Sequence, residues 1–301
     1  MVARHRLWAA IAACVVGVVV GFAVAAPASA APMYPVNYNI AAALATGTFD
    51  ADTPAPGVDK PHCRSTNHPV PVVLVHGTMT NQNASWQAIG PELANNGYCV
   101  YSTTVGRLPY SNGFGGVDKL ENSATELAAF VTKVRKWTGA PKVDLIGHSQ
   151  GAAINLTYLD KNQGYKNVAR VVGLAGANNA PEFWSGIAGA IPGAQELLAL
   201  GIPAASDLLS PASFRFTPRT YPGIEYVNIV SRYDELAIPK DVAFLPPGPN
   251  VRNLFVQSFC PDSHVGHLGM IADPGVTRIL LNELDPGNRK PMTCAGFGIP
   301  F

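Results

Sequence analysis

The feature that most constrains the fold of this chain is a glycine-flanked serine at residues 147–151, which read Gly-His-Ser-Gln-Gly. A run typical of a β-strand, residues 142–146, precedes this segment, and a run typical of a helix, residues 152–160, follows it. A G-x-S-x-G pentapeptide between a strand and a helix is typical of a sharp turn that exposes the serine. The turn strains the serine backbone, and the glycines let strand and helix approach closely. We therefore predict that Ser149 is a nucleophile at the carboxyl end of a parallel sheet.

Strand-like and helix-like segments alternate on both sides of this turn. The strand-like runs are residues 70–75, 99–105, 142–146, 168–174, 224–230 and 251–256. The helix-like runs are residues 40–45, 86–96, 120–139, 152–160 and 273–284. A strand that is apolar throughout, such as the first of these, is expected in a sheet covered on both faces. The pattern predicts an α/β fold with a mostly parallel, doubly wound sheet and helices on both faces.

One connection between two strands is much longer than the others. Residues 181–222 include an apolar stretch at 187–209, with further large apolar side chains such as Trp184. A connection of this length in a compact domain is usually functional. We predict a helical cap over the active-site cleft, and an ordinary packed insertion is the alternative. The sequence leaves open whether the cap moves as a lid at a lipid surface.

The N-terminal segment has the pattern of an export signal. Two arginines precede an uncharged apolar run, residues 7–26, and an Ala-Ser-Ala triplet follows it. This order is typical of a secretory signal peptide. We predict a signal peptide over residues 1–30, cleavage after Ala30, and a secreted domain over residues 31–301 without a stable membrane span. An uncleaved anchor, or a lipid anchor on Cys14, is the alternative.

Cysteine usage agrees with export. The four cysteines outside the signal are Cys63, Cys99, Cys260 and Cys294. Since no pair has C-x-x-C spacing, we do not expect a zinc site or another metal. Three disulfide connectivities are possible. Cys63 and Cys99 lie near the starts of consecutive parallel strands, which meet at one edge of a sheet, so we predict the pairs Cys63–Cys99 and Cys260–Cys294.

Composition limits the domain count and the partners. The 301 residues suffice for one large α/β domain or two small ones, and only 14% of them are charged. Lysine and arginine number 21 against 20 aspartates and glutamates, and a long basic segment is missing. We therefore do not expect nucleic acid as a partner. We also expect a monomer, although composition does not bear on the oligomeric state.

A serine nucleophile needs a base, and the base needs a carboxylate that orients it. After a G-x-S-x-G turn, the acid and then the base follow the serine along the chain. Asp234 follows the strand at 224–230 by a short turn, so we predict Asp234 as the acid, with Glu235 as the competitor. Asp144 lies inside a strand and is interpreted as structural, and Asp262 comes after the final strand.

Two histidines, His264 and His267, follow Asp234 and lie between the last strand and the last helix. We favour His267 as the base because it is nearer the helix that begins at Asp273, and neighbouring glycines leave room for its ring. His148 adjoins the serine and should point away from it, so we expect His148 to pack beside the turn.

An oxyanion intermediate needs two backbone N–H donors. The first is predicted to be Gln150, which follows the nucleophile and begins a helix whose dipole favours negative charge. The second should come from the loop at residues 76–81, where an apolar strand ends in His-Gly. We predict the N–H of Thr78 for this role, and an ordinary tight turn is the alternative.

Together these residues resemble the class 2 lipase family, which are secreted bacterial triacylglycerol lipases with an α/β-hydrolase fold. The resemblance covers about residues 69–286. Its clearest segments are residues 73–78, 142–151, 231–239 and 260–269. By position it implies Ser149 as nucleophile, Asp234 as acid, His267 as base, and Thr78 and Gln150 as oxyanion donors. Family members often carry a cysteine pair in the cap, whereas residues 190–195 here contain none.

These observations predict a secreted serine hydrolase that cleaves carboxylic esters, above all acylglycerols, through an acyl-enzyme and without a cofactor. The substrate is then a lipid or ester, met in some cases at a lipid–water interface. An acyltransferase on the same fold is the first alternative. A non-catalytic surface-binding protein is the second, although such a protein would usually have lost a triad member. The apolar cap argues against a peptidase.

Overall fold

The computed structural model describes residues 33–178, 203–204, 219–236 and 240–294. The predicted signal peptide, residues 1–30, lies outside these ranges, as does most of the predicted cap at 181–222. Across the described ranges, no helix combines the length and apolar character needed to cross a bilayer.

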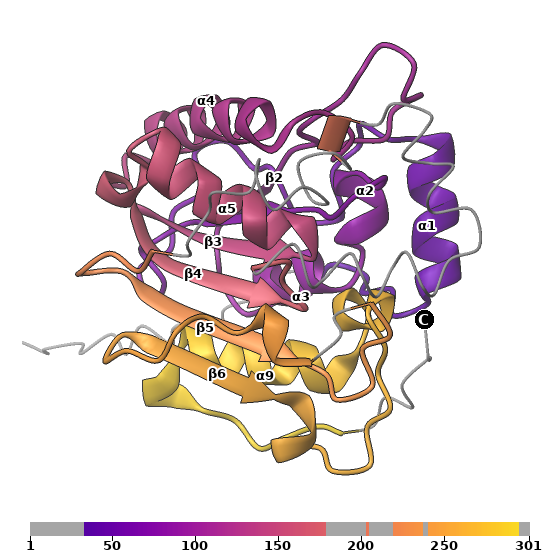
Figure 1. The fold of residues 1–301 in the computed structure, drawn as a ribbon, viewed down its shortest axis with the longest axis vertical. Coiled ribbons are helices and arrows are strands. Elements are labelled where there is room, and N and C mark those ends of the chain that lie inside the picture. The colour runs from indigo at the N-terminus through magenta and orange to yellow at the C-terminus, as the bar shows by residue number, and fades with distance from the viewer. Residues whose placement is uncertain (1–32, 179–202, 205–218, 237–239, 295–301) are drawn as a thin grey trace, which may run out of the picture. The chain divides into compact units, whose positions relative to one another are not determined.

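Six parallel strands form one sheet at the centre of the described part (Figure 1). The strands are β1 (Val72–Val75), β2 (Val100–Ser102), β3 (Val143–His148), β4 (Val168–Leu174), β5 (Glu225–Val230) and β6 (Val251–Phe255). Their order is β2-β1-β3-β4-β5-β6, and every neighbouring pair is parallel. The chain first moves outward from β1 to β2 and then crosses back to β3. Ligands of open α/β sheets bind where the order reverses in this way, beyond the carboxyl ends of the strands.

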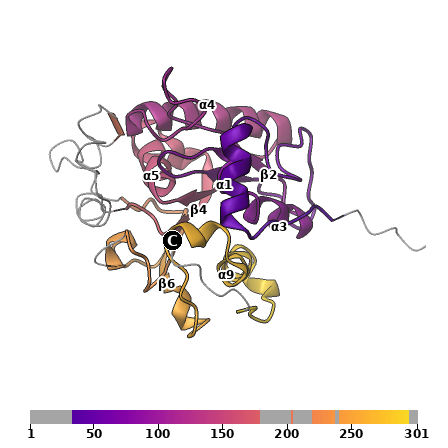
Figure 2. The same ribbon diagram turned by 90° about the vertical axis from the view of Figure 1, so that its right-hand side faces the viewer.

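Helices cover both faces of this sheet, as the alternating pattern predicts (Figures 1 and 2). The α-helices are α1 (Ile40–Phe49), α2 (Gln82–Ser85), α3 (Ile89–Asn95), α4 (Leu120–Thr138), α5 (Gln150–Lys161) and α9 (Pro274–Leu284). Short 3-10 helices are η1 (Gly164–Lys166), η2 (Lys240–Ala243), η3 (Val256–Ser258), η4 (Leu268–Ile271) and η5 (Pro286–Asn288).

Each face of the sheet has its own hydrophobic core. On β1, Val73 and Val75 join the core under α4 and α5. Val72 and Leu74 point the other way and join the core under α1, α3 and α9. This alternation follows from the two-residue period of side chains along a strand. A strand buried on both faces must therefore be apolar throughout, which is what made β1 recognisable in the sequence.

Several element boundaries differ from the sequence-based expectation. The helix expected over residues 86–96 begins only at Ile89, because residues 82–85 form the separate short helix α2, capped by the Asn81 side chain. The last helix begins as predicted. Asp273 is its N-cap and accepts a hydrogen bond from the N–H of Val276 at 2.9 Å, and Pro274 is its first residue.

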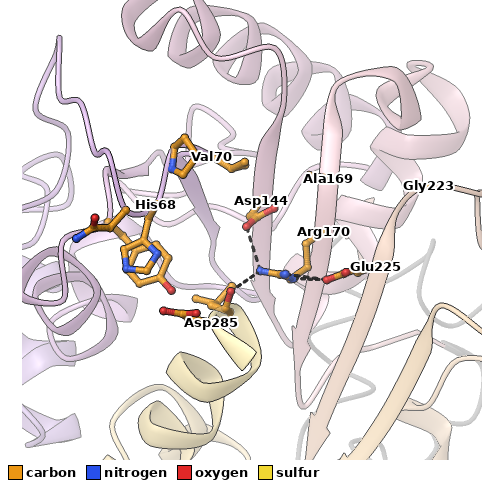
Figure 3. Close-up of a pocket in the computed structure, with 12 residues that line it drawn as sticks. His68, Val70, Asp144, Ala169, Arg170, Gly223, Glu225 and Asp285 are labelled. Atoms are coloured by element: carbon orange, nitrogen blue, oxygen red, sulfur yellow. Dashed lines mark hydrogen bonds and ion pairs between the residues drawn. The ribbon is translucent and has the colours of Figure 1, made fainter. Parts of the chain in front are cut away.

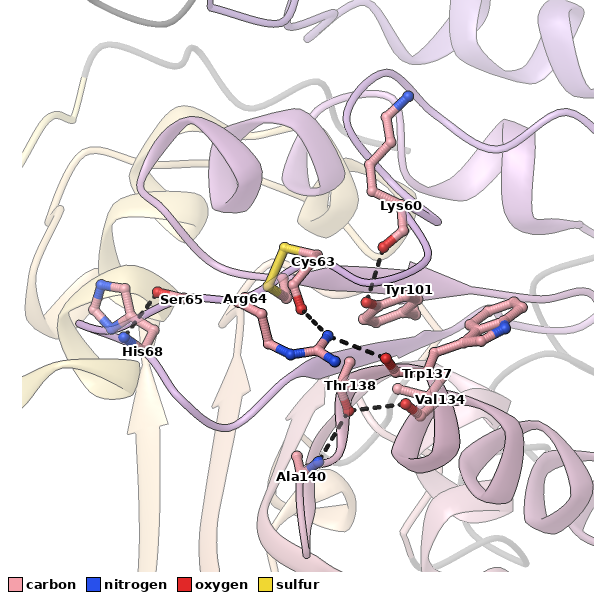
Figure 4. Close-up of a disulfide and its surroundings, with 11 residues drawn as sticks. Lys60, Cys63, Arg64, Ser65, His68, Tyr101, Val134, Trp137, Thr138 and Ala140 are labelled. Atoms are coloured by element: carbon pink, nitrogen blue, oxygen red, sulfur yellow. Dashed lines mark hydrogen bonds between the residues drawn. A yellow bond between two sulfur atoms is a disulfide. The ribbon is translucent and has the colours of Figure 1, made fainter. Parts of the chain in front are cut away.

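Two disulfides join the cysteine pairs that the sequence predicts, Cys63–Cys99 and Cys260–Cys294. The first connects the segment before β1 to the start of β2 (Figure 4). Beside it, the Arg64 guanidinium donates to the carbonyl oxygens of Cys63 and Trp137 at 2.9 and 3.0 Å, so it links this segment to the end of α4. The second joins the segment after η3 to the described C-terminal residues.

The amino end of the sheet holds a partly buried charge cluster beside a pocket of about 330 Å³ (Figure 3). Arg170 on β4 contacts Asp144 on β3 at 3.4 Å and Glu225 on β5 at 2.7 Å. It also donates to the carbonyl oxygen of Leu284 at the end of α9, at 2.9 Å. These contacts agree with the interpretation of Asp144 as a structural carboxylate. Burial nevertheless raises the pKa of Asp144 to about 7, because desolvation outweighs the attraction of Arg170.

Candidate active site

Ser149 lies on a strained turn between the end of β3 and the start of α5. Its backbone has φ 54° and ψ −124°, which is unusual for a residue with a side chain. The flanking glycines are required by close approach. A Cβ on Gly147 would lie 2.5 Å from the amide nitrogen of Ala152, and one on Gly151 would lie 2.1 Å from the carbonyl oxygen of Val75. The segment therefore has the strand–turn–helix geometry that the pentapeptide predicts.

The predicted acid and base are in direct contact. Asp234 follows β5, and its two carboxylate oxygens lie 3.0 and 3.1 Å from Nδ1 of His267. Both side chains are buried, and Asp234 has no exposed surface. Since a carboxylate only accepts, Nδ1 carries the proton in this contact, and Nε2 is the ring atom that can accept a proton. This is the arrangement of a base oriented by an acid.

The competing residues, Glu235 and His264, make other contacts. Glu235 accepts a hydrogen bond from the main-chain N–H of His267, with Oε2 at 2.9 Å. His264 is exposed, and its ring packs against that of Tyr233 with centroids 4.3 Å apart. The structure therefore brings together Asp234 and His267 from the two candidate pairs.

His148 packs beside the turn, as expected, but also makes a contact that the sequence did not indicate. Its Nε2 lies 3.0 Å from the carbonyl oxygen of His267, and the two rings are 5.0 Å apart. Burial, and then the neighbouring His267, lower the pKa of His148 to about 3. His148 is therefore a neutral donor that links the serine turn to the loop of His267.

The loop after β1 reaches the serine turn, where oxyanion donors were predicted. A Cβ built on Gly77 would lie 3.1 Å from Cβ of Ser149. The Thr78 hydroxyl donates to the side-chain oxygen of Gln150 at 3.1 Å, so the side chains of the two residues predicted to supply the donors are in contact. Gly116 packs against the same Gln150 side chain. It has φ +65°, and an added Cβ would lie only 2.5 Å from the Gln150 side-chain oxygen.

His76 is a further residue whose part the sequence did not settle. Its Nε2 accepts a hydrogen bond from the N–H of Val105 at 3.0 Å, and Nδ1 donates to the carbonyl oxygen of Gly77 at 2.8 Å. Full burial lowers its pKa to about 4, so the ring stays neutral at neutral pH. His76 thus holds the loop after β1 against the loop after β2.

The described residues offer no cluster of three or more His, Cys, Asp or Glu side chains that could hold a metal ion. The carboxyl end of the sheet carries Ser149 on its strained turn and the contact between Asp234 and His267.

Comparison with known proteins finds a family likeness over part of the chain. Residues 69–189, here called the class 2 lipase segment, match the family described as lipase (class 2). This segment is similar to the class 2 lipase family. The class 2 lipase segment contains the loop after β1 and the turn at Ser149, whereas Asp234 and His267 lie beyond it.

The curated relatives that part of this chain matches are triacylglycerol lipases. Those of Pseudarthrobacter phenanthrenivorans and Burkholderia plantarii are each 38% identical over 86 residues. The aligned part covers 27% of this chain, and 25% and 22% of the two relatives. The chain therefore spans about a quarter of the length of these relatives.

Solved structures share the fold at low identity. Bacillus licheniformis lipase BlEst2 in its mature form has a TM-score of 0.53 at 16% identity, over 73% of this chain and 94% of that one. Aspergillus fumigatus lipase B has a TM-score of 0.51 at 15% identity, over 77% of this chain and 55% of that one. These likenesses, with the parallel sheet, identify an α/β-hydrolase fold, as the class 2 lipase resemblance implies.

Proposed function

We propose that this protein is a serine hydrolase that cleaves carboxylic esters, with acylglycerols as the substrate class. The observation that carries the proposal is the buried contact between Asp234 and His267 at the sheet edge where Ser149 occupies a strained turn. The likeness of part of the chain to triacylglycerol lipases supports the choice of substrate class.

In the proposed mechanism, the Oγ of Ser149 attacks the ester carbonyl carbon while Nε2 of His267 takes the hydroxyl proton. Asp234 keeps Nδ1 protonated and stabilises the imidazolium that forms. The developing oxyanion accepts hydrogen bonds from the N–H groups of Gln150 and Thr78. Transfer of the proton to the alkoxide oxygen releases the alcohol and leaves an acyl-enzyme on Ser149.

The acyl-enzyme is then hydrolysed by the same groups. His267 removes a proton from water as the water attacks the acyl carbon, and it returns that proton to Oγ of Ser149. The carboxylic acid leaves, and the free serine is regenerated. An alcohol in place of water would complete an acyl transfer, so the access of water to the cleft decides between hydrolysis and transfer.

The proposal includes export. The two disulfides favour an oxidising compartment, which agrees with an N-terminal signal peptide over residues 1–30. The secreted chain would then be a monomeric catalytic domain over residues 31–301, with a cap near 181–222 above the site. Sequencing the N-terminus of the exported protein tests the cleavage after Ala30. An N-terminus that still contains residues 1–30 would refute it.

The decisive experiment is Ser149→Ala. Turnover of p-nitrophenyl butyrate should fall by at least about 10³-fold, because the nucleophile is lost while the fold is kept. A phosphonate inhibitor should label the wild type, with the mass adduct on Ser149, and leave the variant unlabelled. Retained turnover by the folded variant would remove Ser149 from the mechanism.

A substrate series resolves the class of ester. Glycerides and p-nitrophenyl esters with acyl chains of two to eighteen carbons are compared below and above the solubility limit. A preference for acylglycerols is expected, and the release of acid rather than transesterified product should dominate. Turnover confined to esters without a glycerol would contradict the proposed substrate class.

A further inference from the structure

The peptide backbone of His267 is held from two sides by side chains of other loops. Its N–H donates to Oε2 of Glu235 at 2.9 Å, and its carbonyl oxygen accepts from Nε2 of His148 at 3.0 Å. His148 and His267 are both buried, and Glu235 is partly buried. These bonds are separate from the contact of the ring with Asp234. The ring and the main chain of one residue are thus anchored independently.

The two anchoring side chains adjoin the proposed nucleophile and the proposed acid. His148 precedes Ser149, and Glu235 follows Asp234. Because neighbouring side chains on a turn point in different directions, one member of each pair faces the reacting groups and the other reaches the backbone of His267. We propose that His148 and Glu235 are positioning residues that set the place of the base between the nucleophile and the acid. This inference rests on the proposed serine-hydrolase function.

The surroundings of His148 suit a fixed donor. A carbonyl oxygen only accepts, so Nε2 of His148 must carry the proton in this contact. Its other nitrogen faces the loop after β1, where a Cβ on Gly77 would lie 3.3 Å from Nδ1. The ring therefore fills the space between the loop of the oxyanion donors and the loop of the base. A buried ring with a pKa of about 3 keeps one donor and one acceptor throughout the neutral range.

Glu235 supplies the opposite bond through a carboxylate oxygen, and a charge-assisted bond of this kind is stronger than one between neutral groups. The hydrogen bond that Glu235 accepts and the one that His148 donates together fix the position of the His267 backbone relative to the sheet edge. A displacement of a catalytic group by about 1 Å can cost about 10²-fold in rate. Loss of either bond should therefore lower kcat, while the substrate pocket and KM are largely kept.

Matched variants that differ in side-chain length test whether His148 and Glu235 must reach the backbone of His267. His148→Gln keeps an amide donor near the position of Nε2, whereas His148→Asn places its amide near Nδ1, too short for the His267 carbonyl. Glu235→Gln keeps an acceptor at full length, and Glu235→Asp keeps the charge but shortens the reach. We expect the two short variants to lose about 10- to 100-fold in kcat with KM within about threefold. The two long variants should stay within about fivefold of the wild type.

Controls use exposed residues of the same types. His264→Asn and Glu121→Asp should retain wild-type kcat, since His264 is exposed and Glu121 pairs only at the surface with Lys161. Circular dichroism and thermal unfolding show whether each variant is folded. If a short variant fails to fold, His148→Phe, which keeps a ring without a donor, or Glu235→Leu is measured by the same criterion.

The outcomes separate this inference from the proposed function. If Ser149→Ala is inactive and the short variants keep kcat within about twofold, the positioning roles are wrong and the hydrolase stands. If long and short variants lose kcat equally, reach is not the cause and the inference is overturned. If Ser149→Ala remains active, the proposed function fails first.

Discussion

At the residue scale, His267 is the point where the candidate site is assembled. Its ring contacts Asp234 on one loop, its N–H contacts Glu235, and its carbonyl contacts His148 on another loop. Asp234 contacts the ring of His267 and Glu235 contacts its main-chain N–H, so the two carboxylates cannot replace each other. The neighbouring His264 shares none of these contacts and packs on Tyr233 instead.

This contrast leads to a prediction for the two histidines. His267→Ala should lower kcat/KM for a p-nitrophenyl ester by about 10³-fold or more, because a nucleophile and its base act as one unit. His264→Ala should change it by less than about threefold, since the residue is exposed. Steady-state kinetics on both purified variants provide the check. Equal losses would mean that the wrong histidine has been assigned as the base.

At the element scale, the turn at Ser149 depends on how closely β1, β3 and α5 approach. Gly151 at the start of α5 lies against the backbone of β1, where an added Cβ would be 2.1 Å from the carbonyl oxygen of Val75. By contrast, Gly139 ends α4 with φ +69° and has no heavy atom within 4 Å of an added Cβ. Gly151 is required because a side chain would have no space, whereas Gly139 is favoured only by its backbone conformation.

Gly151→Ala should therefore be far more damaging than Gly139→Ala. The first must push α5 from β1, which should cost more than about 4 kcal/mol of stability or prevent folding. The second should cost about 1 kcal/mol, the price of a side chain in the left-handed region. Urea unfolding followed by circular dichroism measures both. A Gly151→Ala protein as stable as Gly139→Ala would contradict the packing described for this turn.

At the scale of the whole described domain, the two ends of the sheet differ in their electrostatics. The carboxyl end carries the Asp234–His267 pair, and the amino end carries Arg170 with Asp144 and Glu225 (Figure 3). Asp144 has an ordinary pKa of 3.8 and one of about 7 in the folded protein. Folding therefore takes up a proton between these values, and this contribution to stability is lost as pH rises from about 4 to about 7.

Asp144→Asn removes this titration and still leaves an oxygen for Arg170. Relative to the wild type, the variant should gain stability as pH rises from 4 to 8, by on the order of 2–4 kcal/mol. The free energy of unfolding in urea at pH 4, 6 and 8 gives the trend. Glu225→Gln, at the exposed partner of the same arginine, is the matched control and should show no comparable gain. A difference independent of pH would show that Asp144 is ionised throughout.

Much of the fold follows from local patterns in the sequence. The apolar run of β1, the apolar positions of α4 at spacings of three and four residues, and the Asp-Pro start of α9 are patterns over residues close in the chain, so they are recognisable without a structure. The pairing of Cys63 with Cys99 also follows, because parallel strands begin at one edge of a sheet. The split into α2 and α3 was missed, since the cap of α2 comes from a loop residue with no periodic signal.

The sequence by itself determined that Ser149 occupies a strand–turn–helix segment and that a carboxylate and a histidine follow it in order. Only the tertiary structure decided that Asp234 rather than Glu235 meets the ring, and that His267 rather than His264 is buried beside it. Only the tertiary structure showed that His148 and His76 connect neighbouring loops by hydrogen bonds. Both histidines bind main-chain groups, and because every residue carries such groups, no residue pattern can specify which one is reached. Those choices depend on the long-range register of six strands.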